Sequence, residues 1–431
     1  MRLPALLDYQ HAVQLPQVAF CDSDLRRGTP RLTPLGMPAV ASGGFALTFD
    51  ITVSGSRYAV RCFHKPGNHL QERYSEISRF IQVNPNLEFL ANVDYRAQGI
   101  RVNGVVFPIV RMEWVDGLPM SDWVEDNLGS PENLMALRQR LWQVVIAMKG
   151  MGVAHGDLQH GNILVDTKGD IRLVDYDGMF VPNLRPLGAA EYGHRNYQHP
   201  DRGSSYDATL DLFSAHVIDV SLTALAEAPE LWNEFHTGDN LIFTDTDFAD
   251  PRGSVLFARL MRQTGLTKRT RVLIDACHTR FSAVPQVLAG ETVRTSTHFS
   301  SAASGNRQAV SVPPILLASE RDRLIANQGN EVTVVGTVTS YRTIEVTRRK
   351  ISFINFGDFR RGAFTIVVFG RAGTELRRKF LSQSDLHGRH VSITGLLTIY
   401  EKDGRRPTPQ IELRRVSALR FVTENFVASV A

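Results

Sequence analysis

The chain lacks any apolar run of about 18 residues, so no segment is expected to cross a membrane as a helix. Cysteine is also scarce: Cys21, Cys62 and Cys277 lie far apart and in no metal-ligand spacing. The N-terminus has too short an apolar run for a secretory signal, and the sequence shows no internal repeat. We therefore expect reduced thiols, a cytoplasmic location and no zinc site or disulfide framework.

Positive charge is unevenly distributed along the chain, although the formal net charge is only +4. From Glu331 to the C-terminus the sequence holds 17 Lys or Arg against 9 Asp or Glu, whereas the rest holds 31 against 35. A basic domain joined to a mildly acidic body is typical of proteins with a polyanionic partner.

The 431 residues are enough for two or three domains. Residues 1–30 have little pattern and are expected to form an extension. Strand runs with glycine turns from about residue 31 to 112 precede helical patterns from about 116 to 289, including a long helix with Ser130 as its cap and Pro131 in its first turn. Strands first and helices later predict a two-lobed α+β domain over residues 31–289.

A second, smaller domain is predicted at the C-terminal end, over residues 313–431. Residues 290–312 are rich in Ser, Thr, Ala and Gly, which predicts a flexible linker before it. A helical pattern at residues 374–381 follows the third of five β-type runs, which lie at residues 332–343, 351–356, 363–369, 390–400 and 410–421. This order predicts a five-stranded OB-type β-barrel.

Two carboxylates and an amide form the most informative set in the sequence: Asp157, Asn162 and Asp175, all in turns beside β-type runs. Such a set suits phosphoryl transfer, because Asn162 and Asp175 can hold a divalent cation on the phosphates of a nucleotide. Asp157 can accept the proton of an attacking hydroxyl. The stretch resembles the catalytic loop and metal-binding segment of the protein-kinase superfamily, and with Gly156 before the aspartate it is also similar to small-molecule phosphotransferases.

The resemblance covers about residues 36–290 and implies a phosphate-binding part in the first lobe. The loop Gly43-Gly44-Phe45 would cover the phosphates of ATP with its backbone. Arg61 stands where the family has a lysine and would grip these phosphates, held in place by Glu76 of the following helix. Lys65 lies on the same strand face as Arg61 and is an alternative for this role.

An adenine-binding hinge is implied by the run from Arg111 to Gly117. Met112 would lie beside the adenine, and the backbone of Glu113 and Val115 would read the edge of the base. A plain buried strand remains the alternative for Met112.

Two further contacts in the second lobe are implied by the same resemblance. Asp211 would brace the backbone around His155, and Arg280 would pair with Asp201, which replaces the family's glutamate.

Several positions depart from the family pattern. Gly156 replaces an arginine, so activation by a phosphorylated segment docking there is not expected. Gln159 replaces a lysine and Asp177 replaces a glycine. His160 and His199 have no third ligand at zinc spacing and are expected to be structural histidines. These departures leave open a nucleotide-binding pseudokinase that acts as a scaffold.

Aromatic and basic residues alternate in the C-terminal domain in a way that suits single-stranded DNA or RNA, because aromatic rings stack on bases and cations follow phosphates. Phe353 or Phe356 must point inward, since successive side chains alternate between the faces of a strand. The candidate nucleic-acid contacts are Arg348, Arg349, Lys350, Phe353, Phe356, Arg360, Arg361, Arg405 and Arg406.

The sequence as a whole resembles a bacterial Ser/Thr protein kinase of the eukaryotic type, fused to an OB-fold domain. The resemblance implies ATP and Mg²⁺ as cofactors, and an OB domain that brings the kinase to single-stranded nucleic acid or to a protein partner. A pseudokinase scaffold and a small-molecule phosphotransferase are the alternatives.

Overall fold

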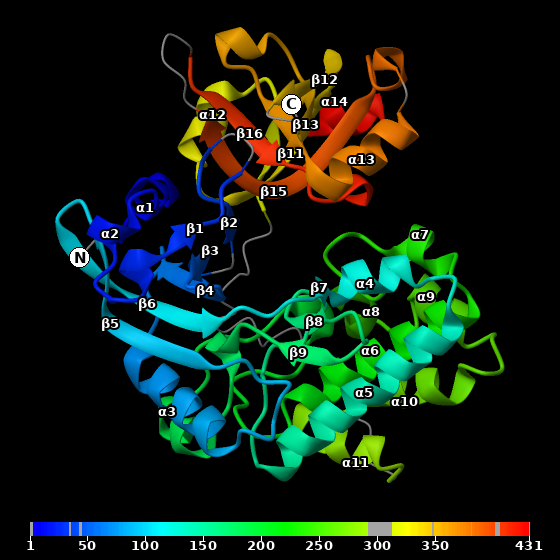
Figure 1. Cartoon of the computed structure of the whole chain (residues 1–431). Coiled ribbons are helices and arrows are strands. Elements are labelled where there is room, and N and C mark those ends of the chain that lie inside the picture. The colour runs from blue at the N-terminus through cyan, green and yellow to red at the C-terminus, as the bar shows by residue number, and fades with distance from the viewer. Residues whose placement is uncertain are drawn as a thin grey trace. The chain divides into compact units, whose positions relative to one another are not determined.

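The computed structural model describes residues 3–33, 36–42, 45–291, 313–346, 349–380, 382–400 and 406–430. The chain divides into two compact units (Figure 1). The first unit comprises Met1–Pro66, Gln98–Ile109 and Gln308–Ala431, and the second comprises Gly67–Ala97 and Val110–Arg307. Residues 31–112, predicted as one lobe, are therefore shared between the two units.

The N-terminal sheet lies mostly in the first unit and has the strand order β1-β3-β4-β6-β5, with β2 paired to β3. Buried apolar side chains recur at every second position of β3, and Phe49 and Ile51 of β3 pack in the core of the sheet with Val60 of β4. The strands are β1 (Thr29–Pro30), β2 (Val40–Ser42), β3 (Ala46–Val53), β4 (Ser56–Phe63), β5 (Val93–Val102) and β6 (Val105–Glu113).

Residues 3–30, the described part of the predicted extension, are more ordered than their sequence predicts. They form α1 (Leu6–Val13) and α2 (Pro16–Ala19), and α1 buries Tyr9 and Val13 in the core of the N-terminal sheet. The Tyr9 hydroxyl donates to the carbonyl of Phe63 on β4 at 2.8 Å. A helix of two turns has too few residues for its apolar period to stand out in the sequence.

A second sheet in the first unit has the order β10-β11-β15-β16-β14-β13-β12, with β17 paired to β15. The expected helix after the third β run is present as α13 (Gly370–Lys379), and α12 (Arg321–Ala326) and α14 (Glu424–Val430) flank the sheet in sequence. The strands are β10 (Ile315–Leu317), β11 (Glu331–Thr337), β12 (Ser340–Val346), β13 (Arg349–Asn355), β14 (Thr365–Val368), β15 (His390–Tyr400), β16 (Thr408–Glu412) and β17 (Arg420–Phe421).

This sheet does not confirm the prediction of a five-stranded OB-type barrel. The first predicted run divides at Val338 and Thr339 into β11 and β12, the last divides into β16 and β17, and β10 is additional. The pairing order of the described residues runs from β10 to β12, and no closed barrel is found among them. The chain bends at Val338, whose amide donates to the carbonyl of Arg389 at 2.9 Å.

The second unit is mostly helical and contains a small sheet of order β7-β8-β9. The predicted long helix is α5, and Ser130 stands at its N-cap position without a side-chain capping bond. The helices are α3 (Leu70–Val83), α4 (Met120–Asp126), α5 (Pro131–Gly150), α6 (Asp211–Glu227), α7 (Leu231–Phe235), α8 (Asp245–Ala249), α9 (Val255–Leu260), α10 (Thr267–Cys277) and α11 (Val284–Leu288); the strands are β7 (Leu118–Pro119), β8 (Ile163–Val165) and β9 (Ile171–Leu173).

Helix α6 lies in the middle of the second unit (Figure 1). Its residues from Asp211 to Leu225 are all buried. Its fully buried Asp219 accepts hydrogen bonds from Arg138 at 3.1 Å and Trp142 at 2.8 Å on α5, and from Arg269 at 2.9 Å on α10. These bonds compensate the burial of the Asp219 charge and join three helices. No helix in the described part of the chain is long and apolar enough to cross a membrane.

Candidate active site

The loop of residues 154–162 connects α5 to β8 and carries two of the three predicted catalytic residues. Its backbone pairs with the segment after β9 through two hydrogen bonds between Ala154 and Phe180, at 3.1 and 2.8 Å. Asp211, at the start of α6, accepts from the amides of His155 at 2.6 Å and Gly156 at 2.8 Å. The predicted bracing of this loop by Asp211 is thereby confirmed.

The backbone conformation and the surroundings of Gly156 both require a glycine at this position. Its φ is +78°, and a Cβ atom there would lie 2.1 Å from the carbonyl oxygen of Gly178. A side chain at position 156 is excluded both by the backbone conformation and by the lack of space. The glycine that distinguishes this loop from most protein kinases therefore has a local packing cause.

Asp157 and Asn162 lie in direct contact. The side-chain amide nitrogen of Asn162 donates to Oδ2 of Asp157 at 2.9 Å and to the Asp157 carbonyl at 3.0 Å. The nitrogen and oxygen lie at opposite ends of the amide, so this arrangement leaves the Asn162 oxygen as the end that can ligate a cation. The other carboxylate oxygen of Asp157, Oδ1, accepts from the amide of His194 at 2.6 Å.

Asp175 follows β9 and lies next to the loop in the backbone hydrogen-bond network. The amide of Val174 donates to the carbonyl of Asn162 at 3.0 Å, and the imidazole Nε2 of His155 lies 3.0 Å from the carbonyl of Val174. Asp175 has a left-handed backbone with φ of +68°, which is uncommon outside glycine, and strained residues of this kind cluster at functional sites. The structure thus brings the three residues predicted for catalysis to adjacent backbone segments.

Metal binding at this place would depend on one carboxylate and one amide. No group of three or more His, Cys, Asp or Glu able to hold a metal ion occurs among the described residues. Asn162 and Asp175 fit Mg²⁺, because that ion takes few protein ligands and keeps contacts with phosphates and water.

Helix α3 is tied to the segment that follows β9. Tyr74 donates a short hydrogen bond from its hydroxyl to the carboxylate of Asp177. Arg73 donates to the carbonyls of Leu187 at 3.2 Å and Gly188 at 2.6 Å. Sequence patterns did not single out Tyr74 or Arg73, because neither contact is local in the chain.

Glu76, predicted to hold the phosphate-binding cation, accepts from Arg79 and from the side-chain amide of Asn183 at 2.8 Å. These bonds lower the pKa of the Glu76 carboxyl, with the Arg79 bond as the largest cause. The predicted partner Arg61 belongs to the first unit, so the pairing of Arg61 with Glu76 stays a prediction. Arg61 is only 5% exposed, which excludes an ordinary solvated strand residue.

The remaining predicted nucleotide contacts are divided between the units. Phe45 is half-buried in the first unit, and Gly43 and Gly44 lie outside the described residues. In the second unit Met112 is buried at the end of β6.

One backbone group of the predicted hinge, the amide of Glu113, already forms a hydrogen bond within the protein. The amide of Glu113 donates to the carbonyl of Asn92 at 2.9 Å. Only the carbonyl of Glu113 is therefore left to read an adenine edge, while both backbone groups of Val115 stay candidates.

The histidines of this region confirm one expectation and add a residue that the sequence did not reveal. His160 bonds the Tyr197 hydroxyl at 2.7 Å, and burial lowers the pKa of His160 to about 3. His199 bonds the carbonyl of Ala276 at 2.9 Å, so both act as structural histidines. The added residue is His194, whose Nε2 lies 2.8 Å from Oδ1 of Asp239. Burial lowers the pKa of His194, but the hydrogen bond and the negative charge of Asp239 outweigh burial, so the pKa is raised overall.

The predicted ion pair between Arg280 and Asp201 is not formed in the described part of the chain. Asp201 accepts instead from the backbone amide of Phe281 at 3.4 Å, and Arg280 is exposed. The turn after α10 presents its backbone rather than the arginine side chain to Asp201.

Several of the predicted nucleic-acid residues lie on β13 and on the following turn, Phe359–Arg361, in the first unit. Arg342 lies over the rings of Phe353 at 5.6 Å and Phe359 at 4.3 Å, measured from Cζ to the ring centroid, and Arg360 lies over Phe359 at 5.6 Å. Neither Arg342 nor Phe359 was among the predicted contacts.

The other predicted nucleic-acid residues differ in their exposure to solvent. Phe356 packs on the core and on Phe364 at 5.3 Å, so it is the inward-facing phenylalanine and not a stacking residue. Four of the predicted basic residues are exposed: Lys350, Arg360, Arg361 and Arg406. Arg349 is the first residue of β13. Arg348 and Arg405 lie outside the described residues.

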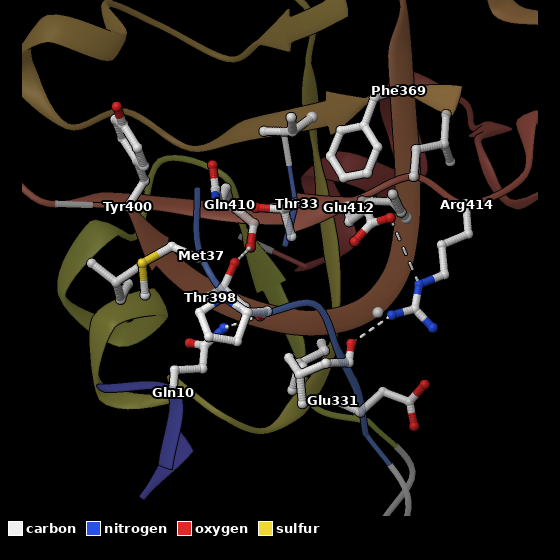
Figure 2. A pocket seen from close by; sticks show the side chains of 18 of the residues that line it. Gln10, Thr33, Met37, Glu331, Phe369, Thr398, Tyr400, Gln410, Glu412 and Arg414 are labelled. Atoms are coloured by element: carbon white, nitrogen blue, oxygen red, sulfur yellow. Dashed lines mark hydrogen bonds and ion pairs between the residues drawn. The ribbon is translucent and has the colours of Figure 1, made fainter. Parts of the chain in front are cut away.

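A pocket of about 510 Å³ lies elsewhere in the first unit, between its N-terminal segment and the face of β15 and β16. Figure 2 shows Thr398 and Gln410 of the sheet facing Thr33 and Met37. Arg414 donates to the carbonyl of Val40 on β2 at 2.8 Å. Glu331 and Glu412 also line the pocket, so its mixed charge suits a polyanion less well than the β12–β13 hairpin does.

Comparisons with known proteins point to kinases. A protein of Oryza sativa subsp. japonica described as cyclin-dependent kinase F-2 is 31% identical over 175 residues, which are 38% of this chain and 52% of that protein. Mitogen-activated protein kinase kinase 2 of Arabidopsis thaliana is 24% identical over 121 residues, 27% of this chain and 33% of that protein. The chain thus spans between a third and about half of the length of these relatives.

A solved structure, the kinase of Cydia pomonella granulovirus, aligns with a TM-score of 0.40 at 13% identity, over 62% of this chain and 94% of the viral chain. The sequence matches no protein-family model. The sequence similarity supports a relationship to the protein-kinase superfamily, and the mixed α and β architecture is compatible with it.

Proposed function

We propose that this chain is an ATP- and Mg²⁺-dependent protein kinase that phosphorylates serine or threonine. The observation that supports this most strongly is the convergence of Asp157, Asn162 and Asp175 on neighbouring backbone segments of the second unit. Two acids and an amide at this spacing match the needs of phosphoryl transfer, which depends on positioning and charge neutralisation.

Asp157 is placed to act as the base in this reaction. A carboxylate has about four lone-pair sites, and in Asp157 one is taken by Asn162 and one by the His194 amide. Acceptor capacity remains on both oxygens for the proton of an attacking hydroxyl. Bound ATP with Mg²⁺ would supply the phosphoryl group and neutralise its charge, and Asn162 with Asp175 would hold the ion.

The other nucleotide contacts in this proposal are those predicted from the sequence. Arg61, buried on β4, would bind the phosphates with Glu76 in support, and Phe45 would cover them. Met112, the Glu113 carbonyl and the Val115 backbone would line the adenine site.

Two alternatives remain, and each rests on a particular observation. A nucleotide-binding pseudokinase is favoured by Arg61 and Gln159, which replace lysines of active kinases. A small-molecule phosphotransferase is favoured by Gly156, but that marker is weakened because the contact with Gly178 alone requires glycine there.

The C-terminal domain would target the kinase to single-stranded DNA or RNA. Arg342 of β12 and Arg360 of the turn after β13 support this role, because both guanidinium groups lie over the ring of Phe359. The strand order supports an OB-type relationship. In the order of paired strands β12 stands at one end and β11 is second from the other end. Only Val338 and Thr339 separate these two strands in the chain, so one bent segment joins the two ends of the order.

Phosphate transfer from labelled ATP to a generic basic protein, together with autophosphorylation, tests the enzyme proposal. We expect the Asp157→Ala variant to lose at least about 10³-fold in rate while its ATP affinity stays within about threefold, because the base acts mainly on the chemical step. Asp170→Ala is the matched control, because Asp170 is an exposed acid of the same unit. EDTA should abolish transfer.

The outcomes separate the alternatives. ATP binding without any transfer by the wild type would establish the pseudokinase alternative. Transfer to small hydroxyl compounds but not to proteins would establish the small-molecule phosphotransferase. Absence of nucleotide binding would refute all three.

A further inference from the structure

Arg202 is a buried arginine that joins the catalytic loop to the segment in front of it. It is only 3% exposed, and its Nη1 donates to the carbonyl of Gly156 at 2.8 Å. The same nitrogen lies 2.5 Å from the carbonyl of Tyr192 and 2.6 Å from Oε1 of Gln198. One guanidinium nitrogen therefore contacts both the loop that carries Asp157 and residues 192–198.

Two glycines allow this close approach. Gly156 cannot carry a side chain, so the arginine that the family places at that position is excluded here. Gly193 has φ of +71°, and a Cβ atom there would lie 2.9 Å from Arg202 Nη1 and 2.9 Å from the Gly156 carbonyl oxygen. Arg202 thus approaches the loop at the residue where an arginine is missing, and Gly193 leaves the space for it.

The burial of Arg202 is not fully compensated by hydrogen bonds. Its Nε and Nη2 atoms are buried and have no hydrogen-bond partner among the described residues. Burial lowers the pKa of Arg202, and the charges of Asp157, Asp211 and Glu191 oppose that shift. A buried cation with unsatisfied donors contributes little net stability, so a role in the site explains its placement better than a contribution to folding does.

The contacts of Arg202 bear directly on the geometry of Asp157. The segment that Arg202 holds through Tyr192 and Gln198 includes His194, whose amide donates to Oδ1 of Asp157 at 2.6 Å. On the other side Asp211 holds the amides of His155 and Gly156. Release of Arg202 would free the segment and remove one of the two bonds that orient the Asp157 carboxylate.

We propose that Arg202 is a positioning residue that locks residues 192–198 onto the catalytic loop and so orients Asp157, without any phosphorylation of the chain. This role rests on the proposed kinase function. The lock is built from the Arg202 side chain, the carbonyls of Gly156 and Tyr192 and the side-chain oxygen of Gln198, so it is assembled as soon as the chain folds. The enzyme would therefore be active in its unphosphorylated form.

The test compares Arg202→Met and Arg202→Lys with the wild type, with Arg280→Met as a control because Arg280 is an exposed arginine of the same unit. We expect Arg202→Met to lower kcat by about 10- to 100-fold and to leave the KM for ATP within about threefold, since a displaced base costs rate rather than nucleotide binding. Arg202→Lys should recover part of the lost kcat. Wild-type protein treated with phosphatase should keep its activity.

Hydrogen exchange supplies a second readout that does not need activity. Peptides covering residues 153–160 and 190–198 should exchange at least about tenfold faster in Arg202→Met than in the wild type, while peptides of α10 stay unchanged. If Arg202→Met does not fold, Gly193→Ala keeps the arginine but crowds its contact with the segment, and it should give the same combination of lower kcat and faster exchange.

The results distinguish this inference from the proposed function. A folded Arg202→Met protein with wild-type kcat and wild-type exchange would overturn the positioning role and leave the kinase proposal intact. Loss of wild-type activity on phosphatase treatment would overturn the claim of independence from phosphorylation. If the wild type transfers no phosphate, faster exchange in Arg202→Met would still support the lock, and unchanged exchange would refute it.

Discussion

Replacing Gly156 with alanine is expected to destabilise the second unit by about 2–5 kcal/mol. The left-handed backbone at φ of +78° costs an L-residue about 1–2 kcal/mol. The added Cβ would lie 2.1 Å from the Gly178 carbonyl oxygen, and both partners are backbone, so relief requires the loop and the segment after β9 to separate. Overpacking of this kind costs about 1–3 kcal/mol.

Two control variants separate these contributions. Gly203 has φ of +52° with open space around its Cβ position, so Gly203→Ala should show the backbone cost alone. Gly129 has neither a positive φ nor a neighbour within 4 Å, so Gly129→Ala should change stability by less than about 0.5 kcal/mol.

Urea unfolding followed by tryptophan fluorescence is the suitable assay. All four tryptophans of the chain, Trp114, Trp123, Trp142 and Trp232, lie in the second unit, so the signal reports on that unit. We also expect the kcat of Gly156→Ala to fall with its stability, because Asp157 follows directly. If Gly156→Ala is no less stable than Gly203→Ala, the argument from crowding against Gly178 is refuted.

Two further predictions concern pH and nucleic acid. His160 is buried and neutral, with a pKa of about 3 in the folded state. Below about pH 6.5 its imidazole is protonated in the unfolded state but not in the folded state. The free energy of unfolding should therefore fall by about 2 kcal/mol between pH 7 and 5. His160→Asn should remove this part of the acid sensitivity in urea unfolding at the two pH values; an unchanged pH dependence would contradict it. Replacing Lys350, Arg360 and Arg361 with alanine should weaken binding of labelled single-stranded DNA and lower the slope of log K against log salt by about 0.7 for each phosphate that the variant no longer neutralises. Arg323→Ala, an exposed arginine on α12, should leave the slope unchanged, and a wild-type affinity that does not depend on salt would count against the nucleic-acid role.

Much of the candidate site could be predicted from local sequence patterns. Asp157 and Asn162 lie five residues apart in one loop, so their spacing in the chain already constrains their contact. The bracing role of Asp211 was implied by the resemblance to protein kinases, and the structure confirms it. The strand at residues 390–400 was also predicted with its observed bounds, because Val391, Ile393, Leu397 and Ile399 recur at alternate positions along it.

Other features depended on packing between distant segments. The five predicted runs at the C-terminal end became more strands, since a bend at Val338 breaks one run and short strands carry little periodicity. Phe353 and Phe356 look equivalent in the sequence, and only the packing of Phe356 on Phe364 decides which of them faces inward.

The sequence by itself determined the chemical groups of the candidate site and the local elements that carry them, because short spacings and periodic patterns act within a few residues. Only the tertiary structure decided how that site is held. Arg202 lies 46 positions from Gly156, and His194 lies 37 positions from Asp157. Contacts over such separations depend on how helices and loops pack together, and no local pattern of residues encodes them.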